Sequence, residues 1–347
     1  MVLVLLPLWL VGCAAPTPSI MRYEGQAGAA APVWPPPPER AHYRYVGQLT
    51  GEENFQMNRE AVSGGRRMLA WLVGLVAGQR APVVLQRPQG GFTDSAGRVY
   101  VTDVSRAAVY VFDEVAGRLA VWEMAGRNTR FETPLGITGG EDRQILVADG
   151  GLGRVIRLDS MGRPVGGFGA GLLQRPVGLA RDAVSGRVFV ADSQAHDIKV
   201  FDRQGNFLET WGRRGEGQGE FNAPTYLTFA GGRLYVTDTL NSRIQVFDGA
   251  GRFIRSVGRR GLFLGDLPRP KGVAVDRDDN LYVVESYYDY LLVFNEKGDF
   301  LLPIGGTGKG IGEFYLPAAV WTDQRNRVYV ADTFNGRVVV FEYLGEA

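Results

Sequence analysis

Histidine and cysteine, which often serve as metal ligands, general bases or nucleophiles, are scarce in this sequence. The 347 residues include two histidines, His42 and His196, and a single cysteine, Cys13. This composition excludes a His-rich zinc site, a Cys-x-x-Cys metal site, an intrachain disulfide and the attachment of c-type haem. We expect four aspartates to begin hairpins, where a carboxylate usually accepts backbone N–H groups: Asp94, Asp182, Asp276 and Asp323. We therefore predict no catalytic residue, no metal ligand and no cofactor.

The cysteine directly follows an apolar run. Residues 1–12, MVLVLLPLWLVG, are too few to cross a bilayer as a helix and have the length of a signal-peptide core. The stretch LVGC at residues 10–13 resembles a bacterial lipobox. This resemblance implies removal of residues 1–12 and a lipid anchor on Cys13, and Ala14 in place of aspartate implies the outer membrane, facing the periplasm. The alternative is a buried N-terminal strand with an unreactive cysteine.

Two segments lie outside the regular pattern described below. Residues 13–41 contain AAPTPS, GQAGAAAP and PPPPER, a composition that predicts an extended tether. Residues 56–86 contain an apolar run from Met68 to Ala77 that is flanked by arginines and is too short to span a membrane. We predict a short helix over residues 66–78, which either covers one end of the domain or lies against the membrane interface or a partner helix.

Composition and charge indicate the fold class and exclude one class of partner. The 48 glycines and 18 prolines, together with many Val, Tyr and Phe, are typical of short strands separated by tight turns. Lys and Arg total 38 against 37 Asp and Glu, so there is no excess positive charge to attract nucleic acid. We predict an all-β protein that does not bind nucleic acid.

From residue 87 onward the sequence contains six similar units. In each unit a strand-like run ends in an acid, a second strand closes nine residues later, and successive acids are 43 to 47 residues apart. A proline introduces a strand before this pair, and the first five units have a fourth strand after it. These units predict a six-bladed β-propeller with four-stranded antiparallel blades. The repeated acids are Asp103, Asp149, Asp192, Asp238, Glu285 and Asp332.

The sixth unit ends after three strands. The segment AHYRYVGQLTGEENF, residues 41–55, has the same pattern as the fourth strand of complete units, with YVG and EENF in place of SVG and GDL. We predict that this N-terminal strand closes the last blade, so that the propeller comprises residues 42–347 with an insertion at 56–86. Such closure would stabilise the ring, because both chain ends become hydrogen-bonded within one sheet.

Two units carry a more specific motif. DTLNSRIQVF at 238–247 and DTFNGRVVVF at 332–341 resemble the NHL repeat, with its core D-(S/T)-x-N-x-R-(I/V)-x-x-(F/Y). The resemblance covers residues 41–55 and 87–347 and implies a propeller fold without fixing an activity. We expect the recurrent motif residues to be structural, since a catalytic group is normally needed once: Asp238, Asn241, Arg243, Asp332, Asn335 and Arg337.

Two functions are open at this point. We predict a lipid-anchored scaffold in the cell envelope that binds an envelope protein or a small ligand at its loop face. Related propellers include lyases and lactone hydrolases with a metal in the central tunnel, so the alternative is a metal-dependent hydrolase or lyase with its site on the axis. A calcium site there would need several oxygen ligands that converge on the axis.

Departures from the repeat indicate where a partner could bind. The fifth unit has the turn SYYDY, and clustered tyrosines are typical of binding hot spots, although some of them could pack against a neighbouring connector. In the third unit His196 and Asp197 are expected to form a solvated pair. Basic residues in the glycine-rich connectors predict a positive rim: Arg213, Arg214, Arg259, Arg260 and Lys309. The predicted binding residues are Tyr287, Tyr288, Tyr290, His196, Arg213 and Arg259.

Overall fold

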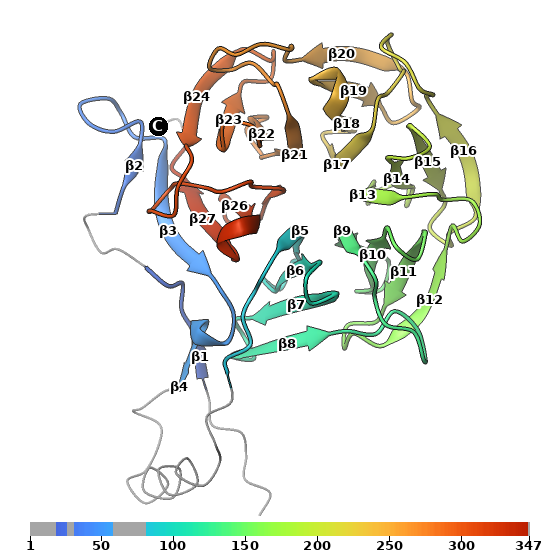
Figure 1. The fold of residues 1–347 in the computed structure, drawn as a ribbon, viewed down its shortest axis with the longest axis horizontal. Coiled ribbons are helices and arrows are strands. Elements are labelled where there is room, and N and C mark those ends of the chain that lie inside the picture. Colours follow the sequence, from blue (N-terminus) through green and yellow to red (C-terminus); the bar gives the residue numbers. More distant parts are fainter. Residues whose placement is uncertain (1–18, 26–30, 58–80, 346–347) are drawn as a thin grey trace, which may run out of the picture.

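The computed structural model describes residues 19–25, 31–57 and 81–345, and it arranges six sheets around a central axis (Figure 1). The predicted all-β, six-bladed propeller is confirmed. Within these residues, helix is limited to three short 3-10 turns, η1 (Glu52–Asn54), η2 (Thr239–Asn241) and η3 (Thr333–Asn335). No helix in the described part is long and apolar enough to cross a membrane. Cys13 and the predicted helix over residues 66–78 lie outside the described residues.

Blades 1 to 5 are four-stranded antiparallel sheets whose strands follow one another from the axis outward in chain order (Figure 1). Consecutive strands are joined by short turns, so each blade forms from one local stretch of sequence. Blade 1 consists of β5 (Pro88–Thr93), β6 (Val99–Asp103), β7 (Ala108–Asp113) and β8 (Arg118–Trp122), and blade 2 of β9 (Pro134–Gly139), β10 (Ile145–Asp149), β11 (Arg154–Leu158) and β12 (Pro164–Phe168). Blade 3 consists of β13 (Pro176–Arg181), β14 (Val188–Asp192), β15 (Asp197–Phe201) and β16 (Phe207–Trp211), and blade 4 of β17 (Pro224–Ala230), β18 (Arg233–Asp238), β19 (Arg243–Asp248) and β20 (Phe253–Val257). Blade 5 consists of β21 (Pro270–Val275), β22 (Leu281–Glu285), β23 (Tyr290–Phe294) and β24 (Phe300–Gly305).

The N-terminal segment closes the sixth blade, as predicted. Strand β3 (Tyr43–Leu49) pairs antiparallel with β27 (Arg337–Tyr343), and the blade continues inward through β26 (Arg327–Asp332) and β25 (Val320–Thr322). Tyr45 lies opposite Phe341 in the register, and their ring centroids are 6.3 Å apart. In Figure 1 the blue β3 runs beside the red β27, so the two ends of the propeller sequence share one sheet.

The segment before β3 differs from the prediction of an extended tether over residues 13–41. Strand β2 (Val33–Trp34) adds a fifth strand to blade 6, and the Trp34 ring packs edge-on against Phe341 at 5.3 Å. Strand β1 (Ser19–Met21) pairs with β4 (Phe55–Met57) in a separate two-stranded sheet, and Met21 is buried. These apolar side chains give parts of a proline- and alanine-rich segment something to bury against the propeller.

The hydrophobic core lies between successive blades. One cluster joins blades 5 and 6 through side chains such as Tyr282 and Phe341, and another joins blades 6 and 1 through Tyr329 and Tyr110. The middle strands of each blade are buried on both faces, which explains their nearly continuous apolar sequences. Because every blade packs against two neighbours, the ring must close for all of these faces to be buried.

Glycines allow the innermost strands to pack closely around the axis. A Cβ atom on Gly90 would lie 2.2 Å from the backbone oxygen of Leu135 in the next blade, and one on Gly178 would lie 2.2 Å from that of Thr225. No larger residue fits such a backbone contact without moving a strand. Blade 4 has Tyr226 at the position that corresponds to these glycines.

Candidate functional site

The two ends of the propeller are built from different loops. One end, which we call the connector face, carries the turns between the second and third strands and the connectors from each outer strand to the next inner strand. The other end, the hairpin face, carries the turns between the first and second strands and between the third and fourth. A central channel runs between the two faces.

On the connector face the repeated acids tie each turn to its connector. Asp103 is buried and accepts four backbone N–H bonds, from Gln86 and Arg87 in the connector and from Ser105 and Arg106 in the turn. Such a carboxylate has its oxygens occupied by the protein itself and is a poor candidate for catalysis. The corresponding acids are also buried: Asp149, Asp192, Asp238, Glu285 and Asp332.

The NHL-like motif adds side-chain partners to two of these acids. In blade 4, Asp238 accepts hydrogen bonds from the Asn241 side chain at 2.8 Å and from Arg243 Nε at 2.9 Å. Arg243 also donates to the carbonyl oxygen of Gly217 in the connector, so the motif links turn, strand and connector. The same contacts, at 2.8 Å each to the acid, recur in blade 6 between Asp332, Asn335 and Arg337.

The hairpin-face aspartates have a comparable local environment. The Asp94 carboxylate accepts the N–H groups of Ala96 and Arg98 and the hydroxyl group of the buried Tyr100 at 3.0 Å. Asp276 and Asp323 accept a buried tyrosine hydroxyl in the same way, and Asp182 accepts the N–H of Val184. Each of these carboxylates therefore stabilises the hairpin in which it lies.

The predicted binding residues divide into exposed and structural groups. Tyr287 and Tyr288 are 60% and 38% exposed, and their rings meet edge to face with centroids 4.8 Å apart. Tyr290 begins β23 and is partly buried. His196 has a left-handed backbone with φ 59°, and its Nδ1 atom accepts the N–H of Ala223 at 3.0 Å, so its imidazole supports a neighbouring connector.

The expected solvated pair of His196 and Asp197 is not formed. Asp197 begins β15 with its side chain buried, and it forms an ion pair with Lys199 two residues along the same strand. The side chains of residues 197 and 199 share one face of the strand, which explains this pairing. Burial raises the pKa of the Asp197 carboxyl, and the Lys199 ammonium opposes that effect.

Two arginines of the predicted positive rim are paired within their own connectors. Arg213 lies 2.9 Å from Glu220, and Arg259 lies 2.9 Å from Asp266. Both arginine side chains are about four-fifths exposed, at 81% and 80%. Because a carboxylate of the same loop faces each guanidinium group, these residues contribute little net charge to the face.

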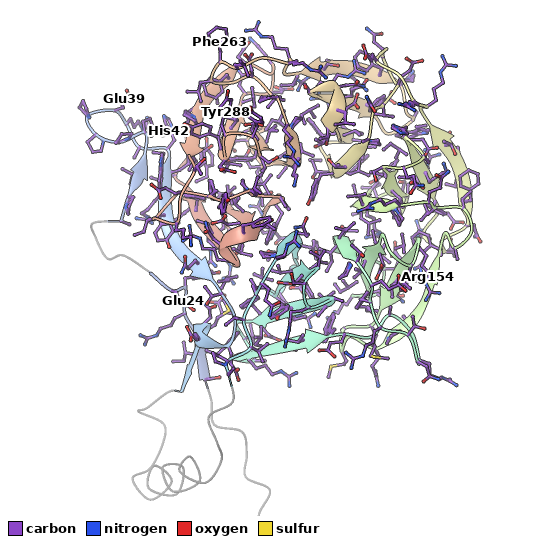
Figure 2. All side chains as sticks on the ribbon, viewed as in Figure 1. Glu24, Glu39, His42, Arg154, Phe263 and Tyr288 are labelled. Atoms are coloured by element: carbon purple, nitrogen blue, oxygen red, sulfur yellow. The ribbon has the colours of Figure 1, made fainter. Side chains whose placement is uncertain are left out.

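Apolar side chains gather on the connector face of blades 4 to 6. Phe263 is 81% exposed, and Figure 2 shows it with Tyr288 over the same blade. Phe263 and Tyr288 line a hollow of about 320 Å³, and Leu240 and Tyr287 line a neighbouring hollow of about 550 Å³. We call the following residues the aromatic patch: Leu240, Leu262, Phe263, Leu264, Tyr287, Tyr288, Tyr315 and Phe334.

Contacts between the loops hold the parts of this patch beside one another from blade to blade. Arg260 in the connector to blade 5 donates to the carbonyl oxygen of Leu240 in the blade 4 turn. The N–H of Leu316, beside Tyr315, donates to Asp289 in the blade 5 turn at 2.8 Å. Tyr315 in turn contacts Phe334, with ring centroids 5.6 Å apart. The patch therefore belongs to one surface.

Sequence reasoning found the tyrosines of blade 5 and missed the rest of the patch. One usable signal was the connector GLFLGDL at 261–267, which carries three large apolar residues where equivalent connectors read GEGQGEF and GKGIGEF. Another was the third motif position, occupied by Leu240 and Phe334, which lies in a turn that faces solvent.

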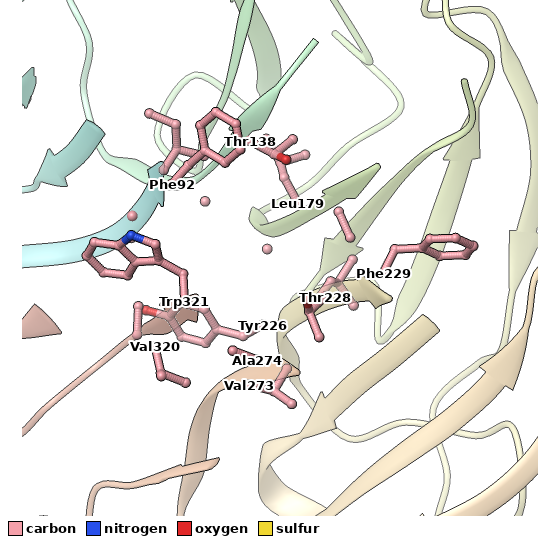
Figure 3. A pocket seen from close by; sticks show the side chains of 18 of the residues that line it. Phe92, Thr138, Leu179, Tyr226, Thr228, Phe229, Val273, Ala274, Val320 and Trp321 are labelled. Atoms are coloured by element: carbon pink, nitrogen blue, oxygen red, sulfur yellow. The ribbon is translucent and has the colours of Figure 1, made fainter. Parts of the chain in front are cut away.

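Tyr226 crosses the central channel. Its hydroxyl group donates to the backbone carbonyl oxygen of Gln89 in blade 1 at 2.8 Å, so the side chain reaches the opposite side of the ring. Burial raises the pKa of Tyr226, which keeps the hydroxyl protonated as a donor. On the hairpin side lies a cavity of about 310 Å³, walled by Phe92, Leu179 and Trp321 among others (Figure 3).

The residues of this channel do not fit a catalytic metal. The cavity is lined by glycine, aliphatic, threonine and aromatic residues, and its one charged lining residue, Arg181, is paired with Glu141. Across residues 19–25, 31–57 and 81–345, no three His, Cys, Asp or Glu side chains are close enough to hold a metal ion. A metal-dependent hydrolase or lyase reaction on the axis therefore lacks its ligand set in this part of the chain.

Comparisons with known proteins agree on the architecture. A family model described as a 6-bladed beta-propeller matches residues 269–346. The chain has the fold of a six-bladed β-propeller. No curated protein matches it.

Several solved structures resemble the chain at low identity. A virginiamycin B lyase from Staphylococcus aureus is 13% identical, with a TM-score of 0.54 over 75% of this chain and 96% of that one. A gluconolactonase from Xanthomonas campestris is 17% identical, with a TM-score of 0.57 over 76% and 90%. An auxiliary nutrient binding protein from Bacteroides ovatus is 12% identical, with a TM-score of 0.59 over 74% and 69%. Such likenesses show a shared fold and no particular activity.

Proposed function

We propose that this propeller is a binding module that captures a partner protein of the cell envelope on its connector face. The observation that carries the proposal is the aromatic patch, in which large apolar side chains are exposed on one surface of three consecutive blades. Contiguous exposed apolar surface generally marks an interaction site, and exposed aromatic residues often supply most of the binding energy.

The charges around the patch indicate the chemistry of the partner. The Arg87 guanidinium lies 5.1 Å above the ring of Phe334. Arg269 lines the same hollow as Tyr287. Neither arginine belongs to an ion pair among the described residues. A complementary partner segment would present apolar side chains flanked by Asp or Glu.

The proposal places the propeller on a lipid anchor. Acylation of Cys13, the last residue of LVGC, would attach the chain to a membrane, and Ala14 favours the outer membrane facing the periplasm. The anchor would increase the local concentration of the propeller near other envelope proteins. Anchoring and capture use separate parts of the chain and can be tested separately.

The test compares two double variants, each of which replaces two large exposed side chains with serine. Phe263→Ser with Tyr287→Ser removes the centre of the patch, whereas Phe207→Ser with Leu208→Ser removes side chains that are 47% and 45% exposed on the outer strand β16. Tagged wild type and both variants are incubated with detergent-solubilised envelopes of the source cell. Each envelope protein that is recovered is then purified, and its binding to wild type and to both variants is measured again. We expect a partner that wild type and the β16 variant capture and the patch variant loses. A partner retained by the patch variant, or lost equally by both variants, would refute the proposal.

A further inference from the structure

Three cationic residues stand at the connector ends of the innermost strands β5 and β21, beside the mouth of the central channel. Arg269 and Lys271 flank Pro270 at the start of β21, and Arg87 directly precedes Pro88 at the start of β5. Arg175, before Pro176 at the start of β13, is the residue of blade 3 that corresponds to Arg87 and Arg269. Each proline begins an innermost strand, so these residues stand at the connector end of the channel wall. Lys271 is a departure from the repeat, because the corresponding residues of the other blades are uncharged: Gln89, Leu135, Val177, Thr225 and Ala318.

The side chains of this cluster, Arg87, Arg269 and Lys271, have no ion-pair partner among the residues that the structure describes. The repeated acids of the same two blades are already occupied: Asp103 accepts the backbone N–H groups of its connector and turn, and Glu285 does the same in blade 5.

The environment of Lys271 is unfavourable for an isolated positive charge. Its side chain is partly buried, and burial is the largest cause that lowers the pKa of the ammonium group. Repulsion from Arg269 and then from Arg87 lowers that pKa further. Attraction to a bound anion would offset this repulsion, so the cluster has the electrostatic character of an anion site.

The channel and the patch define how an anion would reach the cluster. Tyr226 crosses the channel and is hydrogen-bonded to Gln89, next to Pro88 at the connector end of β5, so the cluster faces the connector side. Apolar surface adjoins the cations, because Phe334 lies beneath Arg87 and Tyr287 shares a hollow with Arg269. A ligand with an anionic group next to an apolar group fits both features.

We propose that Arg87, Arg269 and Lys271 form an oxyanion site that binds a carboxylate or phosphate group presented from the connector face. The guanidinium groups can donate paired hydrogen bonds to two oxygens, and the ammonium group supplies a compact charge. The site needs only its three cationic residues. Where the proposed function also holds, it binds an acidic side chain of the captured partner.

The chain offers a direct probe of this site, because it contains four lysines, Lys199, Lys271, Lys297 and Lys309. Reductive methylation with carbon-13 formaldehyde keeps their charge and gives each lysine a distinct NMR signal, which Lys271→Met assigns. The labelled protein is titrated with sodium phosphate and, separately, with sodium acetate, while sodium chloride holds the ionic strength constant. We expect a saturable shift of the Lys271 signal and no saturable shift at the exposed Lys297 and Lys309.

Matched variants distinguish a specific binding site from a general electrostatic attraction of anions to the protein. Arg269→Gln should weaken the saturable binding by at least about tenfold through loss of a charge-assisted hydrogen bond. Arg213→Gln should leave it unchanged, since Arg213 is paired with Glu220. Saturation by phosphate alone identifies a phosphate site, and saturation by acetate identifies a carboxylate site. Absence of saturation with both anions, or binding that Arg269→Gln leaves intact, would overturn the proposal.

This experiment uses no partner protein, so its result is independent of the capture assay. Anion binding without any captured partner would retain the oxyanion site and reject the proposed function. Capture through the aromatic patch without anion binding would retain the proposed function and reject the oxyanion site.

Discussion

The hydroxyl group of Tyr226 in blade 4 donates a 2.8 Å hydrogen bond to the backbone carbonyl oxygen of Gln89 in blade 1. This bond connects opposite sides of the ring at the position where most blades have a glycine in close backbone contact. Tyr226 also lines the cavity on the hairpin side.

Tyr226→Phe should destabilise the propeller by about 1 kcal/mol, because it removes the donor of this bond and leaves the carbonyl oxygen of Gln89 without it. Urea unfolding at equilibrium measures the change. Tyr287→Phe is the control, and this exposed residue should change the free energy of unfolding by less than about 0.5 kcal/mol. Equal stability of the two variants would mean that the bond contributes nothing to the fold.

Adjacent residues of β3 give a test of ring closure. Tyr45 is 3% exposed and packs in the cluster between blades 5 and 6, so Tyr45→Ala should lower the free energy of unfolding by about 3–5 kcal/mol. Arg44 points outward and pairs with Glu342 on the surface, so Arg44→Ala should lower it by at most about 1 kcal/mol. Thermal and urea unfolding of the two variants measure both losses in the free energy of unfolding. Similar losses at both positions would contradict the role of β3 as a buried closing strand.

The sequence predicted the blades because their determinants are local. Each acid, such as Asp103, recurs at nearly fixed spacing and bonds to its own turn and connector. The closing strand was also predictable, since Tyr45 and its neighbours repeat the outer-strand pattern that the sixth unit lacks. The strand containing Trp34 was not, because composition alone does not reveal that one tryptophan in a proline-rich segment packs on Phe341.

The candidate site was predicted less completely, since it depends on contacts between blades. Tyr287 and Tyr288 stood out within one turn, whereas Phe263 and Phe334 join them through loops of neighbouring blades. Arg213 looked like a source of positive charge in the sequence, but Glu220 lies opposite it across the same connector. Such pairings follow from loop geometry, which residue spacing does not specify.

The pKa of Lys271 predicts a pH-dependent difference in stability. The pKa in the folded protein is lowered from the ordinary value of 10.5, so the folded state binds the Lys271 proton less tightly than the unfolded state does. The charged amine therefore destabilises the fold at neutral pH, and this penalty is relieved as the pH rises from the lowered pKa toward 10.5. Lys271→Met should be more stable than wild type at pH 7, with a difference that shrinks toward pH 10. Urea unfolding across this range measures the difference, and a difference that stays constant with pH would show that the Lys271 charge does not cause it.

The anchor can be tested without knowledge of the partner. Cys13→Ser removes the single cysteine of the chain and with it the thiol that acylation requires. We expect wild type to fractionate with membranes and to be released by detergent, and the variant to appear in the soluble fraction. Wild type in the soluble fraction, or a variant that fractionates with membranes as wild type does, would reject the lipid anchor.

Site-specific photo-crosslinking tests the central claim, that the aromatic patch is the surface that captures a partner. The photoreactive residue p-benzoylphenylalanine replaces Phe263 in one protein and Phe207, on the outer strand β16, in another, and both are irradiated in intact cells. The account predicts a discrete covalent adduct with one envelope protein from position 263 and no such adduct from position 207. The absence of an adduct at position 263, or the same adduct from both positions, would contradict it.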